Sequence, residues 1–158
     1  MGGQVKALAA CFAVLAALAP ATIAVAQAPS GMRVLATQHS FERLLGRVEQ
    51  AVEKNRLGVI ATASASRGAA ARGVRIPGNA VVMVFRNDLA VRLLAASVPA
   101  GIEAPLRLYV TANADRTATL SYRAPSAVFA PYRHPEIERL AHELDPLMEQ
   151  IAKDAAGG

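Results

Sequence analysis

The stretch from Ala80 to Asp88 is the most apolar run of the chain outside its N-terminal segment. Residues 81–85, Val-Val-Met-Val-Phe, show no polar alternation, so either face would expose a row of apolar groups if it met water. We therefore predict a central β-strand over 81–86 that is buried on both faces. Asn87 and Asp88 then lead into a short helix that begins at Leu89, with Asp88 as its cap. This strand constrains the architecture, because other elements have to cover it, but it specifies no function.

The first 26 residues have the features of a secretory signal peptide. Lys6 precedes a charge-free segment over 7–26, and Ala24-Val25-Ala26 matches the small-x-small pattern of a cleavage site, so we place cleavage before Gln27. A retained membrane anchor is the alternative, since the segment is about long enough to span a bilayer, although its alanines and Pro20 make it a weak one. We expect a periplasmic or secreted protein with no stable membrane span after cleavage.

Composition narrows the class of the mature protein. Removal of residues 1–26 from the 158-residue chain leaves 132 residues and takes away Cys11, the only cysteine. A domain of this length can be stable without disulfides. The formal net charge of +5 falls to +4 without Lys6. Because the bases form no cluster and aromatic residues are few, the charge does not argue for nucleic acid as a partner.

Periodicity gives the order of the elements. A short strand is predicted over 33–37, and a helix runs from Ser40, whose hydroxyl suits an N-cap, to about residue 55. A second strand follows over 57–65. Residues 64–79 are compatible with one helical turn or a mobile loop. After the central strand, the short helix ends before the prolines and glycine of residues 99–105.

The C-terminal half is easier to interpret. Two segments with alternating polarity, 106–111 and 118–123, flank a polar loop and predict a β-hairpin. The last helix is predicted to begin at Pro135, with a kink or a break and restart at Pro146. The predicted order is β-α-β-β-α-β-β-α, an α+β fold with a mostly antiparallel sheet of about five strands and helices packed on one face. We expect a flexible leader over 27–32 and a single domain over 33–155.

Motifs for catalysis and metal binding are weak. The three histidines, His39, His134 and His142, are too scattered to share a metal without another element, and they are equally compatible with surface or capping roles. No serine lies in a Gly-x-Ser-x-Gly elbow, and no glycine-rich loop leads into a Lys-Ser/Thr pair. We therefore expect neither a cofactor nor a metal, and an enzyme only if scattered residues assemble its site.

One face of the predicted hairpin gathers polar side chains: Arg107, Tyr109, Thr111, Thr119, Ser121 and Arg123. Two arginines, a tyrosine and hydroxyl groups could hold an anionic or planar small molecule. An antiparallel sheet also commonly shows such a face to water. A third interpretation comes from the central strand: if helices cover one face of the sheet, the apolar side chains of the other need a cover, which a second copy would supply.

Several short motifs, in their order, resemble the bacterial domain-of-unknown-function family 302. They are Phe41 at a helix start, Leu57-Gly58-Val59, Phe85-Arg86-Asn87, the segment from Gly101 to Arg107, and Ser121-Tyr122-Arg-Ala-Pro125. The resemblance covers about Val34 to Tyr132. The family's strand-to-helix junction is usually Phe-Gly-Asn-Pro, so this chain departs from it at Arg86 and Asp88. The resemblance implies a small α+β domain that tends to associate with itself, and it implies no established activity.

These observations lead to one main expectation and two alternatives. The main expectation is an exported, homo-oligomeric module that binds a small ligand, such as a small anion, or acts in interactions. The resemblance points to Asn87, Pro105, Tyr122 and Pro125 as positions to examine first, and the polar hairpin face adds Arg107 and Arg123. The alternatives are an enzyme of unknown class and a structural partner protein.

Overall fold

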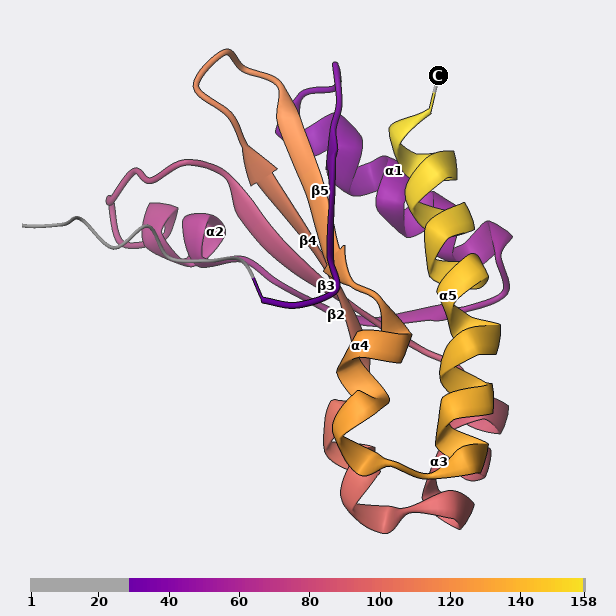
Figure 1. Cartoon of the computed structure of the whole chain (residues 1–158). Coiled ribbons are helices and arrows are strands. Elements are labelled where there is room, and N and C mark those ends of the chain that lie inside the picture. The colour runs from indigo at the N-terminus through magenta and orange to yellow at the C-terminus, as the bar shows by residue number, and fades with distance from the viewer. Residues whose placement is uncertain (1–28, 158) are drawn as a thin grey trace, which may run out of the picture.

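Five strands form one antiparallel sheet (Figure 1). The computed structural model describes residues 29–157, and the expected signal peptide lies outside this part of the chain. The strand order is β1-β5-β4-β3-β2, so β4 and β5 form the predicted hairpin and β1 and β2 lie at the edges. The strands are β1 (Met32–Ala36), β2 (Gly58–Ala63), β3 (Asn79–Phe85), β4 (Leu106–Ala112) and β5 (Ala118–Arg123).

The helices complete the α+β fold that the sequence predicts. Two long helices, α1 and α5, lie on the same side of the sheet, and the short ones gather at its ends (Figure 1). The α-helices are α1 (Phe41–Lys54), α2 (Ala65–Ala70), α3 (Asn87–Ala96), α4 (Pro125–Phe129) and α5 (Pro135–Ala156), and the 3₁₀ helices are η1 (Val98–Glu103) and η2 (Ala130–Tyr132). Within residues 29–157, none of the helices is long and apolar enough to cross a membrane.

The central strand β3 is buried on one face only, which corrects the expectation of burial on both. Val82 and Val84 are at most 1% exposed, whereas Val81, Met83 and Phe85 on the opposite side are half-buried. The reason is that α1 and α5 both cover the side of the sheet to which Val82 and Val84 point. We call this side the inner face and the opposite side the open face.

The open face carries side chains from all five strands. Their alternation and pairing place the following residues on it: Met32, Val34, Ala61, Ala63, Val81, Met83, Phe85, Arg107, Tyr109, Ser121 and Arg123. Val34 is 64% exposed and Tyr109 is 41% exposed. Large apolar side chains on this face therefore remain in contact with solvent.

Two apolar clusters form the interior, and α5 contributes to both. Its C-terminal half packs with α1 over the inner face through Met148 and Ile151, both fully buried. Its N-terminal half packs against α3, η1 and α4 through Ile137 and Leu140. This division explains why α5 runs unbroken through Pro146, where a break was one expectation. Tertiary packing on both sides of the proline outweighs the loss of one backbone hydrogen bond.

The start of α1 is as predicted, apart from its capping hydrogen bond, and the start of α3 is not. Ser40 is the N-cap residue of α1, but its side chain makes no capping hydrogen bond. The helix α3 begins at Asn87 rather than Leu89, and its N-cap residue is Arg86. Asp88, the expected cap, instead accepts a hydrogen bond from Arg86 Nε at 2.8 Å. A charge-assisted hydrogen bond of this kind competes well with capping.

The two edge strands differ in regularity. Along β1 the pairing with β5 is continuous from Met32 to Ala36. In β2 the register with β3 shifts between Val59 and Ala61, and Ile60 between them is 55% exposed. Such a bulge leaves one residue unpaired and bends the strand locally.

Candidate functional site

A groove on the open face is the main candidate site. Its volume is about 250 Å³, slightly below the range of ~300–1,000 Å³ that is usual for sites of drug-sized ligands. We call it the arginine groove. Its lining residues come from β1, β3, β4, β5, η1 and α4: Met32, Val81, Glu103, Leu106, Arg107, Tyr109, Ser121, Tyr122, Arg123 and Val128.

Strand register explains why two arginines meet there. Tyr109 pairs with Ser121, and Leu108 pairs with Tyr122, where the pairing of β4 with β5 ends. Arg107 and Arg123 are the next residues of the two strands, so they lie near each other at this end of the hairpin. Both side chains then emerge on the open face, since residues two apart on a strand share a face. Like charges directly opposite each other on neighbouring strands are unfavourable. An anion between the two guanidinium groups would relieve this repulsion.

The hydrogen bonds of Arg123 leave part of its guanidinium unsatisfied. Arg123 Nη2 donates to the carbonyl oxygen of Ala127 at 3.2 Å. Its Nε atom is buried and has no hydrogen-bond partner among the described residues. A buried donor of a charged group without an acceptor is costly. Because this Nε atom is buried, a ligand in the groove cannot reach it as the side chain lies, and Arg123 acts on the groove through its positive charge.

Glu103, at the end of η1, is the acidic residue of the groove. Its Oε2 atom lies 3.8 Å from Arg107 Nη2. The Tyr132 hydroxyl donates to Oε1 at 3.2 Å. Partial desolvation of Tyr132, together with this hydrogen bond and the negative charge of Glu103, raises the pKa of the Tyr132 hydroxyl. One oxygen of Glu103 is thus fixed by Tyr132, and the other is directed to Arg107.

Tyr122 lies on the inner-face side of β5 and is 6% exposed. Burial raises the pKa of its hydroxyl, and the negative charge of Glu149 raises it further. The phenol of Tyr122 therefore lies on the side of α5 and not beside Arg107 and Arg123, although the residue lines the groove. Ser121, opposite Tyr109, adds a hydroxyl group on the open face.

The structure brings together three of the residues expected at a site. Arg107, Tyr122 and Arg123 all line the arginine groove. Asn87 is the exposed first residue of α3, and Pro125 is the fully buried first residue of α4. Neither of these two residues lines the groove. Each begins a helix: Asn87 begins the helix that follows β3, and Pro125 begins the helix that follows β5.

Five residues of the groove are not among the site residues predicted from the sequence, namely Met32, Val81, Glu103, Leu106 and Val128. Glu103 lies in the segment from Gly101 to Arg107, which indicated the family but did not place a carboxylate at the site. Met32 and Val81 enter the groove because β1 pairs with β5 and β3 pairs with β4, which are contacts between distant parts of the chain. A signal for Val81 existed, because the apolar side chains of the central strand that face away from the helices were expected to need a cover.

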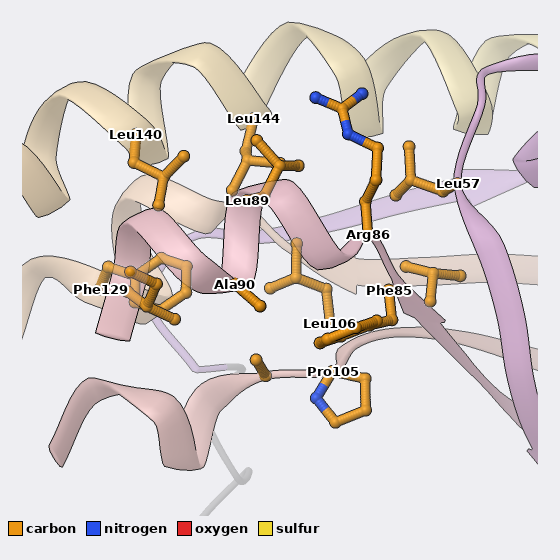
Figure 2. Close-up of a pocket in the computed structure, with 13 residues that line it drawn as sticks. Leu57, Phe85, Arg86, Leu89, Ala90, Pro105, Leu106, Phe129, Leu140 and Leu144 are labelled. Carbon is orange, nitrogen blue, oxygen red and sulfur yellow. The ribbon is translucent and has the colours of Figure 1, made fainter. Parts of the chain in front are cut away.

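A second pocket lies between the two apolar clusters (Figure 2). Its lining is apolar apart from Arg86, whose guanidinium turns toward α5 and away from Pro105 and Leu106 in Figure 2. The volume is about 40 Å³, whereas a single water needs roughly 10–15 Å³. The pocket is therefore a packing gap where β3, α3 and α5 meet, and it is too small for an organic ligand.

The histidines serve local structure where their contacts are described. His134 is the N-cap residue of α5, and its Nδ1 atom accepts a hydrogen bond from the backbone N–H of Glu136 at 3.2 Å. Neither His39 nor His134 lines the arginine groove. Among residues 29–157, no three or more histidine and acidic side chains are grouped so that they could hold a metal ion.

A family model and a solved structure both match this chain. The model of the family named domain of unknown function DUF302 matches residues 32–155. The structure is similar to the crystal structure of an uncharacterized conserved DUF302 protein from Bacillus stearothermophilus, with a TM-score of 0.72. The two chains are 14% identical, and the match covers 80% of this chain and 98% of that chain. At this level of identity the likeness shows the fold alone.

No curated protein matches the chain. The family model, however, spans most of it, including every strand of the sheet. The resemblance that the short motifs indicated is therefore confirmed, and the chain belongs to the DUF302 family.

Proposed function

We propose that this DUF302 domain is an exported binding module that holds the anionic group of a small organic molecule in the arginine groove. The observation that carries the proposal is that Arg107 and Arg123, from neighbouring strands, both line this groove. Export is supported by the N-terminal sequence, whose charge-free segment and small-x-small pattern precede the domain.

The chemistry of the pair suits a carboxylate or a similar planar anion. Guanidinium groups present several N–H donors in a fixed fork, which matches two oxygens of one carboxylate. An anion would also reduce the repulsion between the positive charges of Arg107 and Arg123, which lie on neighbouring strands. Tyr109 and Ser121 provide hydroxyl groups next to this position, and Met32 and Val81 provide an apolar floor.

Isothermal titration calorimetry with defined ligands tests the proposal. The panel consists of acetate, benzoate, inorganic phosphate, glycine and leucine. We expect saturable binding of at least one of them to the wild type, and a loss of at least tenfold in affinity in Arg123→Gln. Arg72→Gln, at an exposed position outside the groove, makes the same charge change and should bind as the wild type does. Absence of saturable binding across the panel, or equal loss in both variants, overturns the proposal.

A second candidate function, self-association, is favoured by the apolar part of the open face. Val34 and Tyr109 are exposed there beside the half-buried Val81, Met83 and Phe85. Five strands about 4.8 Å apart and about 20 Å long give roughly 500 Å² per copy. Two copies packed face to face would bury about 1,000 Å², near the lower limit for a specific interface. We propose a second copy of this chain as the cover.

Light scattering after size-exclusion chromatography over a range of concentrations tests self-association. The small predicted area leads us to expect a dimer that dissociates on dilution. Val34→Glu should give a monomer at every concentration, because it brings a charge into the interface. The control is Val91→Glu, since Val91 is also an exposed valine, 58% exposed, but lies on α3. A wild type that stays monomeric, or a dimer that both variants leave intact, contradicts this candidate.

A further inference from the structure

We infer that the ligand of the arginine groove is a zwitterion, namely a free α-amino acid with an apolar side chain, and not a simple anion. The inference rests on the proposed function, because it names the substrate class of the same site. It comes from Glu103, the one acidic residue that lines the groove.

Glu103 makes the groove a poor site for an isolated anion. Its Oε2 atom lies 3.8 Å from Arg107 Nη2. A ligand carboxylate that pairs with Arg107 therefore comes close to the Glu103 carboxylate, and two like charges at short range in a partly desolvated site repel each other. The side chain of Glu103 is 25% exposed, so solvent screens this repulsion only in part.

A zwitterion turns this repulsion into an attraction. In an α-amino acid a single carbon separates the ammonium group from the carboxylate, so one ligand can meet both signs of charge within the groove. The carboxylate would lie between Arg107 and Arg123, and the ammonium group would lie against Glu103. The groove has this order of charges because Glu103 precedes β4 at the end of η1, while Arg123 comes from the neighbouring strand β5.

The position of Glu103 is fixed before any ligand arrives. The Tyr132 hydroxyl donates to its Oε1 atom at 3.2 Å, which leaves Oε2 on the side of Arg107. A carboxylate that is already held in place loses little conformational freedom when it receives an ammonium group. Glu103 therefore selects the ligand, and Tyr132 is a positioning residue for Glu103.

The rest of the groove selects an apolar side chain of modest size. Its remaining walls include Met32, Val81, Leu106 and Val128, and the aromatic ring of Tyr109 lies beside Val81. The volume of about 250 Å³ suits a single small molecule and leaves no room for a large one. Leucine satisfies these conditions and serves as the probe.

Three matched compounds test the two charged groups of leucine one at a time. L-leucine carries both, 4-methylpentanoate lacks the ammonium group, and 3-methylbutylamine lacks the carboxylate. By titration calorimetry with the full mature chain, we expect leucine to bind at least tenfold more tightly than either of the others. This comparison uses only the wild-type protein, so it does not depend on whether a variant folds.

Substitution of Glu103 provides a second test of the inference. Glu103→Gln keeps an acceptor for Tyr132 but removes the charge, so leucine should lose at least tenfold in affinity while 4-methylpentanoate should bind more tightly than it binds the wild type. Glu138→Gln, at an exposed position in the first turn of α5, makes the same charge change and should alter neither affinity. Thermal melting confirms that each variant is folded.

The outcomes distinguish the inference from the function on which it rests. If 4-methylpentanoate binds the wild type as tightly as leucine, and Arg123→Gln abolishes both, the zwitterion inference is overturned while the anion site stands. If neither compound binds, and no compound of the wider panel binds either, both the zwitterion inference and the proposed anion-binding function are overturned. If leucine binds but Glu103→Gln leaves its affinity unchanged, Glu103 does not select the ligand and the inference is again overturned.

Discussion

At the residue scale, two glycines share a backbone conformation but differ in their surroundings. Gly31 and Gly73 both have φ of +74°, a region that other residues adopt at a cost. A Cβ atom added at Gly31 would collide with the Cβ of Ala127 in α4, whereas one added at Gly73 would meet nothing within 4 Å. The carbonyl of Gly31 also accepts the N–H of Ala124 at 2.9 Å, which ties the start of β1 to the end of β5.

This difference gives a matched prediction. Gly73→Ala should lower the free energy of unfolding by about 1 kcal/mol, the cost of a side chain at positive φ. Gly31→Ala should lower it by at least about 2 kcal/mol, because the collision with Ala127 adds to the same backbone cost. Urea unfolding followed by circular dichroism measures both. Equal losses in the two variants would show that α4 moves aside freely.

Residues of the candidate site differ in how far the sequence could predict them. Arg107 and Arg123 were predictable, because strict alternation over 106–111 and 118–123 fixes the face and a short loop fixes the pairing. Glu103 was not, since the segment before β4 has no periodicity and its 3₁₀ turn became apparent only in the fold. Oppositely charged residues four apart interact by rule only on a helix, so Glu103 and Arg107 gave no signal by their spacing.

At the element scale, a single carboxylate joins the short helix α4 to α5. Asp145 Oδ1 accepts the backbone N–H of Ser126 at 2.9 Å. Ser126 is the second residue of α4, so its N–H has no partner within that helix. Because α4 also carries Val128 of the arginine groove, this contact helps to place one wall of the site.

Removal of this acceptor should destabilise the protein in a graded way. Asp145→Ala leaves the Ser126 N–H without an acceptor, and we expect a loss of about 1–3 kcal/mol in the free energy of unfolding. Asp145→Asn keeps an acceptor oxygen and should cost less than half as much. Chemical denaturation of the wild type and the two variants measures the order of their free energies of unfolding. An Asn variant as unstable as the Ala variant would contradict the acceptor role.

Elements were predictable to the extent that local sequence determines them. The hairpin, α1 and α5 were predicted because alternation or helical spacing continues over several residues. The faces of β3 were not, since a continuous apolar run does not tell which side the helices cover. That choice depends on α1 and α5 packing together on one side, which is a property of the whole fold.

At the scale of the whole molecule, surface carboxylates in ion pairs contribute to the response to acid. Hydrogen bonds from Asn55 and Lys54 lower the pKa of Asp154 below its ordinary 3.8. The paired guanidinium of Arg92 lowers the pKa of Glu143 below 4.5, and Lys153 does the same for Glu149. A carboxyl whose pKa is lower in the folded state stabilises the fold above its unfolded pKa.

The sign of the pH dependence follows from these shifts. As pH falls below about 4.5, the unfolded chain binds more protons than the folded one, so the free energy of unfolding should fall and continue to fall through the lower, folded pKa values. Asp154→Asn should show a smaller fall between about pH 5 and about pH 3 than the wild type. The control is Glu53→Gln, at an exposed position of α1. Urea unfolding at several pH values measures the slopes, and identical slopes would contradict the role of Asp154.

The irregular pairing of β2 has a consequence for how molecules of this protein can be linked edge to edge. Growth of a continuous sheet into a filament requires that β1 of one molecule hydrogen-bond to β2 of the next. The displaced Ile60 interrupts the regular row of donors and acceptors at that edge. Only the β1 edge is regular enough for such contact. When the β1 edges of two molecules pair with each other, each molecule is left with only its irregular β2 edge. We therefore expect strand addition between folded molecules to stop at two.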